Sequence, residues 1–175
     1  MTNTDAQLYQ VTVNFSMSPQ DMVKACGFIR VTPKIRLEDL SVTKNGKLEV
    51  NMKLFSIERK SLAYLGVSEE DLIEVIGSTL RYYIPTGAIL ELNKEQGFRP
   101  ATIIELLAFG ATKLDMPQFP QAIFALGTTF QDTGGHPLVP HIDALGGGRN
   151  LGLHFGYEDL WECSQSFLFL FTQMS

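Results

Sequence analysis

The run of apolar residues at positions 167–171, Phe-Leu-Phe-Leu-Phe, constrains the fold more than any other feature of the sequence. Successive side chains of a β-strand point to opposite faces, so a strand of this composition is apolar on both faces. Such a strand must be covered on both sides, as at the centre of a sheet. The run is also far too short to cross a bilayer. We therefore expect a central strand in a sheet, and no membrane as a partner.

Other segments alternate apolar and polar side chains, at the period of a half-buried strand. The alternation is clear in residues 9–15 and 48–54. Asn45-Gly46 precedes the second segment and suits a type I′ hairpin turn after a strand at residues 40–43. Four short strands are expected near the C-terminus, joined by glycine-rich turns: 122–130, 137–142, 151–155 and 166–172.

Three segments carry the start signal of a helix, a hydroxyl side chain followed three residues later by a carboxylate. The pairs are Ser18 with Asp21, Ser68 with Asp71, and Thr102 with Glu105. The first helix is expected to end at Gly27 and the third before Gly110. The second carries a broad apolar face over residues 72–80. With all three expected on the surface of a sheet, the sequence predicts an α+β fold with helices packed on a mixed or antiparallel sheet.

Charge divides the chain of 175 residues into two portions. Lys and Arg number 14 and Asp and Glu 19, so the net charge is −5. Residues 1–113 contain 13 basic and 13 acidic side chains, whereas residues 114–175 contain Arg149 and six acids. This acidic region argues against nucleic acid as a partner. We expect a single domain over 1–175, with a neutral α+β portion (1–113), an acidic, glycine-rich β portion (114–175) and a hinge candidate at 116–120.

The two cysteines, Cys26 and Cys163, form neither a disulfide framework nor a pair at zinc-ligand spacing. Both are expected to be buried thiols in a reducing compartment. The first ten residues are polar and lack the basic and apolar regions of a secretory signal. The expected location is the cytoplasm.

A longer pattern of residues resembles a known family. It begins with Arg99-Pro100-Ala101-Thr102 before Glu105-Leu106-Leu107 and continues through Ala125-Leu126-Gly127, Val139-Pro140, Arg149-Asn150-Leu151 and Trp161. This pattern resembles a family of small uncharacterised bacterial proteins. More remotely, it is similar to C-type-lectin-like domains, such as the variable proteins of diversity-generating retroelements and the formylglycine-generating-enzyme fold. The resemblance implies a C-type-lectin-like C-terminal part with a loop-rich binding face.

The sequence departs from the lectin pattern at both calcium motifs. Val139-Pro140-His141 and Trp161-Glu162-Cys163 are the nearest matches to the calcium motifs of the sugar-binding lectins, and they would bind calcium poorly. The resemblance therefore does not imply calcium-dependent sugar binding.

Candidate binding residues gather in the acidic portion: His136, His141, Asp143, Arg149, Tyr157, Asp159 and Trp161. Aromatic side chains and arginine are favoured at interface hot spots, and acidic surroundings favour basic or polar partners. The sequence predicts a non-enzymatic binding or interaction protein for a protein or a polar or basic ligand, with no cofactor. Trp161 fits either a binding anchor or a core residue. As an anchor, its alanine variant should lose binding and keep stability.

Two alternatives remain open. One is a metal-dependent hydrolase or oxygenase that uses His136, His141 and His154, although their spacing matches no established metal motif. His141 and Asp143 would share a strand face, whereas His136 would point to the other face. The other alternative is a structural subunit that assembles through its apolar final strand.

Three smaller patterns bear on possible chemistry. Cys163 with His154 and Asp159 is the one conceivable catalytic triad, and its acidic neighbours disfavour a thiolate. Residues 146–149, Gly-Gly-Gly-Arg, fit a turn better than a phosphate loop, because a strand is expected to follow. Arg149 is expected to pair with a carboxylate such as Asp143 or Asp159.

Overall fold

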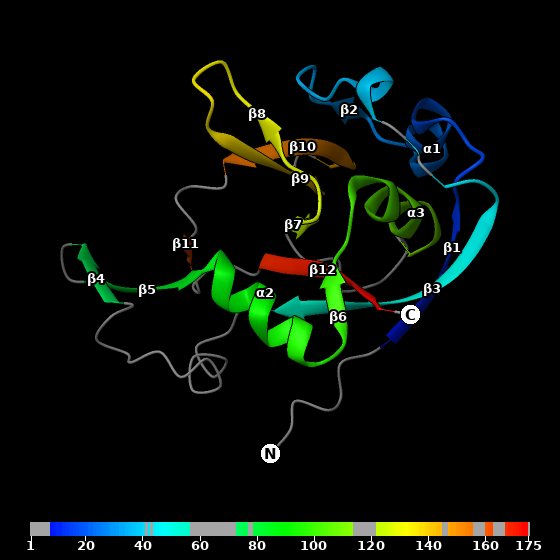
Figure 1. Ribbon diagram of the computed structural model, residues 1–175. Helices are drawn as coiled ribbons and strands as arrows, with labels where there is room; N and C mark the ends of the chain where they lie inside the picture. Colours follow the sequence, from blue (N-terminus) through cyan, green and yellow to red (C-terminus); the bar gives the residue numbers. More distant parts are fainter. Residues whose placement is uncertain are drawn as a thin grey trace.

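The computed structural model describes residues 8–40, 42, 44–56, 73–76, 79–113, 122–144, 147–155, 160–162 and 167–174. Within these residues the fold is α+β, with three α-helices, a nine-stranded mixed sheet and a three-stranded sheet (Figure 1). In chain order the elements are β1 (Leu8–Asn14), α1 (Pro19–Cys26), β2 (Arg30–Val31), the 3₁₀ turn η1 (Leu37–Asp39), β3 (Lys47–Ser56), β4 (Ile73–Ile76), β5 (Thr79–Pro85), α2 (Thr86–Glu95), β6 (Phe98–Pro100), α3 (Ile103–Lys113), β7 (Ala122–Phe124), β8 (Phe130–Gln131), β9 (Pro137–Asp143), β10 (Asn150–Phe155), β11 (Leu160–Glu162) and β12 (Phe167–Gln173). The predicted α+β class is confirmed.

Strand β12 lies in the interior of the large sheet. The strand order is β1-β3-β12-β7-β9-β10-β2, with β6 paired to β12 and β8 paired to β9. Phe169, Leu170 and Phe171 are fully buried. Leu170 packs in one apolar cluster and the two phenylalanines pack in another, because alternate side chains of a strand face opposite sides. The central strand, covered on both faces, is confirmed.

Different elements cover the two faces of this sheet (Figure 1). Helices α1 and α3 pack on the face that carries Leu170. On the other face, Ile84 of β5, Ile89 of α2 and Trp161 of β11 pack with Phe124 of β7. The sheet therefore separates two apolar cores, and both contribute to the burial of β12.

Helix α1 begins and ends where the sequence predicts. The backbone N–H of Asp21 donates to Ser18 Oγ at 3.1 Å, which caps the first turn. Gly27 ends the helix with a φ of 64°, in the left-handed region that favours glycine. Cys26 is fully buried and its thiol donates to the carbonyl oxygen of Leu107 at 3.1 Å. Cys163 lies outside the described residues.

Helix α3 starts at the predicted place, but its position and its end differ from the prediction. Residues 103–110 are all buried, and the helix continues through Gly110 to Lys113. The Phe109 ring meets the Tyr9 ring of β1 edge-on, with 5.5 Å between the centroids. The expectation of a surface helix that ends before Gly110 is wrong. Its sequence is apolar around most of its circumference, which is the pattern of a buried helix.

The expected second helix is wrong, because its described residues form a β-hairpin. Strands β4 and β5 pair antiparallel, with Ile73 opposite Tyr82 and Ile76 opposite Thr79. Ser68, the expected cap, lies outside the described residues. The residues Ile73, Val75 and Ile76 are β-branched and favour strands, whereas an apolar face alone does not distinguish a strand from a helix. Helix α2 follows instead. Its N-cap is Pro85, which makes no side-chain capping bond, so the sequence contains no capping signal for this helix.

The hairpin expected at Asn45-Gly46 is also wrong. Strand β3 pairs with β1 on one side and β12 on the other, and neither Leu40 nor Val42 lies in a strand. Gly46 has the positive φ (87°) that a turn requires, and its carbonyl accepts from the N–H of Phe15 at 2.8 Å. The dipeptide therefore marks a turn, while packing between distant segments selects the partner strand.

The C-terminal strands mostly match the prediction. β9, β10 and β12 lie where expected, but residues 122–130 form two strands, β7 and β8, separated by a turn. Strand β11 was not predicted. The hinge candidate at 116–120 lies outside the described residues.

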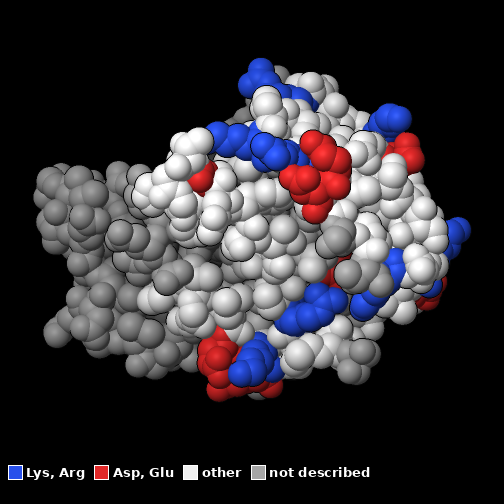
Figure 2. All heavy atoms as spheres, turned by 45° about the horizontal axis from the view of Figure 1, so that its top comes forward, with Lys and Arg blue, Asp and Glu red and all other residues white. Residues whose placement is uncertain are grey.

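Charged side chains of both signs are interspersed on the face shown in Figure 2. Several form pairs on one helix or turn, such as Lys24 with Asp21 and Arg36 with Asp39. Such exposed pairs contribute little to stability. None of the helices in the described part of the chain has the length and apolar character needed to cross a membrane.

Candidate functional site

Tyr157 and Asp159, two of the seven predicted binding residues, lie outside the described residues, as does Cys163 of the conceivable triad. His136 lies in the turn between β8 and β9, where its side chain is 71 % exposed. Its ring nitrogen Nδ1 lies 3.2 Å from Asp132, whose Oδ1 also accepts the backbone N–H groups of Gly134 and His136. These contacts order the turn.

Trp161 lies in the core and is only 3 % exposed. Its indole N–H donates to Thr86 Oγ1 at 2.8 Å, and its ring lies 4.9 Å from the Phe124 ring and 4.8 Å from the Phe169 ring, centroid to centroid. Of the two interpretations that the sequence allows, the structure supports the core residue. We therefore no longer expect its alanine variant to keep full stability.

Arg149 directs one N–H group to the carbonyl oxygen of Cys26, at 3.1 Å. This carbonyl belongs to the last residue of α1, where a positive charge is favourable. Burial raises the pKa of the Cys26 thiol to about 12, against the opposing effect of Arg149. The thiol is therefore protonated at neutral pH and is not a nucleophile.

His141 and Asp143 come together as the sequence predicts. They lie on the same face of β9, with 3.1 Å between His141 Nε2 and Asp143 Oδ2. Asp143 Oδ1 accepts from Asn150 Nδ2 at 2.7 Å, and Asn150 stands opposite Asp143 on β10. Gly152, opposite His141, leaves room for the imidazole, because a Cβ there would lie 2.6 Å from His141 Cε1.

These residues form a polar platform on three neighbouring strands. Arg30 of β2, Asn150 of β10 and Asp143 of β9 stand side by side in the register. They line a pocket of about 410 Å³, which we call the sheet-face pocket; Thr32, His141, Leu151, Gly152 and Leu153 complete its lining. The pocket thus combines two of the predicted residues with Arg30, Thr32 and Asn150, which sequence reasoning missed because only strand pairing brings them together.

The three histidines of this region do not come together as a metal site. Burial lowers the pKa of His141, although Asp143 opposes the shift, and burial also lowers the pKa of His154. His141 Nδ1 is buried and has no hydrogen-bond partner among the described residues, while Nε2 is engaged with Asp143. Within the described ranges, no group of three His, Cys, Asp or Glu side chains is placed to hold a metal ion. His136, His141 and His154 therefore do not form a ligand set.

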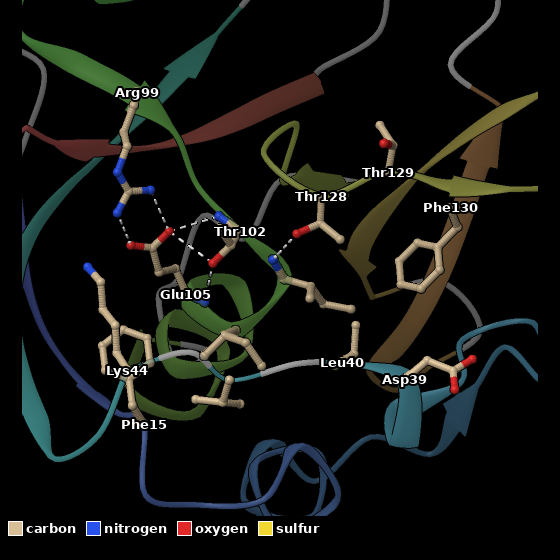
Figure 3. A pocket seen from close by; sticks show the side chains of 13 residues that line it. Phe15, Asp39, Leu40, Lys44, Arg99, Thr102, Glu105, Thr128, Thr129 and Phe130 are labelled. Atoms are coloured by element: carbon tan, nitrogen blue, oxygen red, sulfur yellow. Dashed lines mark hydrogen bonds and ion pairs between the residues drawn. The ribbon is translucent and has the colours of Figure 1, made fainter.

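A second pocket, of about 590 Å³, lies at the start of α3; we call it the α3 pocket (Figure 3). Its lining consists of Phe15, Asp39, Leu40, Val42, Lys44, Arg99, Thr102, Ile103, Ile104, Glu105, Thr128, Thr129 and Phe130. Sequence reasoning recognised Thr102 and Glu105 as a helix start, but it had no signal for the three distant segments that meet them.

A partly buried ion pair forms one wall of the α3 pocket. Arg99 binds Glu105 through two hydrogen bonds, Nη1 to Oε2 at 2.9 Å and Nη2 to Oε1 at 2.6 Å. Burial alone would raise the pKa of Glu105, but Arg99 and the N–H and hydroxyl of Thr102 hold it below its usual range. Three backbone donors at the start of the helix are also used, since Thr102 N–H donates to Glu105, Ile103 N–H to Thr128 Oγ1 and Glu105 N–H to Thr102 Oγ1.

Comparison with protein-family models, with curated proteins and with solved structures gave no match for this chain.

Proposed function

We propose that the chain is a non-enzymatic binding protein that holds a small polar ligand in the sheet-face pocket. One observation carries the proposal: Arg30, Asn150 and Asp143 stand side by side on β2, β10 and β9 and line one cavity. A guanidinium recognises an acceptor such as a carboxylate, whereas a carboxylate recognises a donor such as an ammonium group. Neighbouring strands are about 4.8 Å apart. Arg30 and Asp143 lie on the two outer strands, so they suit a compact ligand that carries both an acceptor group and a donor group.

Three features support binding over catalysis. The platform is held by hydrogen bonds from His141 and Asn150 to Asp143, so its geometry is prepared for a ligand. His141 is poorly placed as a general base, because Nδ1 is buried and Nε2 faces Asp143. The Cys26 thiol has a raised pKa, and it lies in the core on the other face of the sheet. The resemblance of the C-terminal part to C-type-lectin-like domains supports a binding role as well.

The proposal is tested by NMR titration with three probes: glutamine, which is a zwitterion, and its charged fragments acetate and methylammonium. We expect saturable shifts of the backbone amides of Arg30, Thr32 and Gly152 with glutamine. In Arg30→Gln the dissociation constant should rise about tenfold, which corresponds to about 1.4 kcal/mol. Lys24→Gln is the matched control, since Lys24 is an exposed cation outside this pocket. If no probe produces saturable shifts at these amides, the site is wrong.

The alternative of a structural subunit assumed that the apolar final strand packs against another copy of the chain. Strand β12 pairs with β3 and β7 in its own sheet, and its central residues are fully buried. The apolar final strand is therefore used within the chain.

A further inference from the structure

We propose that the α3 pocket binds a second class of ligand, a small amphipathic anion with its acidic group beside Lys44 and its apolar body against Leu40 and Phe130. The volume of about 590 Å³ falls in the range of small-molecule sites, roughly 300–1,000 Å³. The ligand class follows from the distribution of charge and apolar surface around the cavity.

Among the residues that the structure describes, the charges on the lining leave one cation without a carboxylate partner. Arg99 and Glu105 neutralise each other through two short hydrogen bonds, and Asp39 lies 3.7 Å from Arg36. Lys44 pairs with no carboxylate among the residues that the structure describes; its ammonium lies 5.7 Å from the centre of the Phe15 ring. The pocket therefore attracts a negatively charged group to Lys44.

Lys44 lies at one end of the pocket, and the apolar side chains of Leu40 and Phe130 lie at the other. Figure 3 shows Lys44 on the same side as Arg99, Glu105 and Phe15. Leu40 and Phe130 lie at the other side, together with Asp39, whose partner is Arg36. Leu40, Val42, Phe130 and Phe15 are only partly buried, so each keeps apolar surface that a ligand can cover. A ligand that satisfies both ends has an acidic head and an apolar body.

Three backbone donors at the start of α3 are already engaged within the protein. Thr102 N–H and Ile103 N–H already donate to Glu105 and Thr128, at 2.8 and 3.0 Å. These donors are the ones that a helix N-terminus normally offers to an anion. Recognition of the acidic group is therefore assigned to Lys44.

Calorimetric titration with three probes of equal chain length tests the proposal: octanoate, 1-octanol and octylammonium. We expect saturable binding of octanoate, at least tenfold tighter than that of octylammonium. Lys44→Gln should weaken the binding of octanoate about tenfold and leave the binding of 1-octanol unchanged. The reason is that Lys44 attracts the charged carboxylate, which 1-octanol lacks. Lys24→Gln, an exposed lysine outside the pocket, should bind octanoate as the wild type does.

The position of the ligand is tested by NMR with octanoate. Amide shifts at Phe15, Thr129 and Phe130 support the α3 pocket, and shifts confined to other residues overturn it. Equal affinity for octanoate and octylammonium, no effect of Lys44→Gln, or no saturable binding of octanoate would each overturn the proposed ligand class. These readouts do not use the amides of Arg30, Thr32 and Gly152, so the result is independent of the sheet-face pocket.

Discussion

At Trp161 a single side chain joins three elements. The ring packs between Phe124 of β7 and Phe169 of β12, and the indole N–H reaches Thr86 at the start of α2. Large aromatic side chains in such positions contribute most of their free energy through burial. Its role in stability is therefore expected to exceed any role in binding.

We predict that Trp161→Ala lowers the free energy of unfolding by roughly 3–5 kcal/mol, because the substitution leaves a cavity and removes the hydrogen bond to Thr86. Phe155→Ala is the matched control: Phe155 is 43 % exposed, and its loss should cost clearly less than the loss of Trp161. Urea denaturation measures both values. A Trp161→Ala protein as stable as the Phe155→Ala protein would contradict the placement of Trp161 in the core.

Lys53 is a charged residue in a buried position on β3. It is only 3 % exposed, donates from Nζ to Gln96 Oε1 at 2.6 Å, and lies 4.1 Å from the centre of the Phe98 ring. Burial lowers the pKa of Lys53 to about 8, from an ordinary value of 10.5. The unfolded chain therefore binds more protons than the folded protein between these two values, and this group makes stability rise with pH over that window.

We predict that the stability difference between wild type and Lys53→Met changes in favour of the wild type as pH rises from about 7.5 to about 9.5. The expected change in this difference is about 1–2 kcal/mol. In the wild type the buried ammonium becomes neutral over this range, so its unfavourable desolvation disappears, whereas the variant has no charge at this position. Urea denaturation at several pH values measures it. Other titrating groups, Cys26 included, are common to both proteins and cancel. Lys47→Met, at the exposed end of β3, should show no such change.

At the scale of elements, the backbone of the β7–β8 turn lies very close to the segment that joins β6 to α3. The N–H of Gly127 donates to the carbonyl oxygen of Ala101 at 2.9 Å. A Cβ at Gly127 would lie 2.7 Å from the carbonyl oxygens of Pro100 and Ala101. These are backbone atoms that cannot turn aside, so the position requires glycine.

Gly127→Ala is predicted to destabilise the protein by about 1–3 kcal/mol, because the turn must move away from α3. Gly87→Ala makes the matched control, since a Cβ in the first turn of α2 meets nothing within 4 Å. Alanine favours a helix over glycine by up to about 1 kcal/mol, so this variant should be as stable as the wild type or more stable. Thermal unfolding distinguishes the two, and effects of the same sign and size would contradict the contact at Gly127.

On the scale of the whole molecule, the two portions that differ in charge share one sheet. Strands β1 and β3 come from the neutral portion, and β7, β9, β10 and β12 come from the acidic one. The two pockets lie where segments from both portions meet: β2 beside β10, and the start of α3 beside the β7–β8 turn. Charge composition thus divides the sequence but not the described fold.

The features that the sequence alone determined are those governed by local periodicity and capping. The central position of β12, the limits of α1 and the shared face of His141 and Asp143 belong to this group. Each depends on the geometry of one strand or one helical turn, and that geometry repeats over two to four residues.

Only the tertiary structure decided which segments meet. The strands at 73–76 and 79–85, the pairing of β3 with β1, the burial of Trp161 and both pockets depend on contacts between distant residues. Cys26 and Leu107, for example, form a hydrogen bond across 81 positions of the chain. The free energy of such contacts comes from packing and burial in three dimensions, and it overrides weak local preferences for helix, strand or turn.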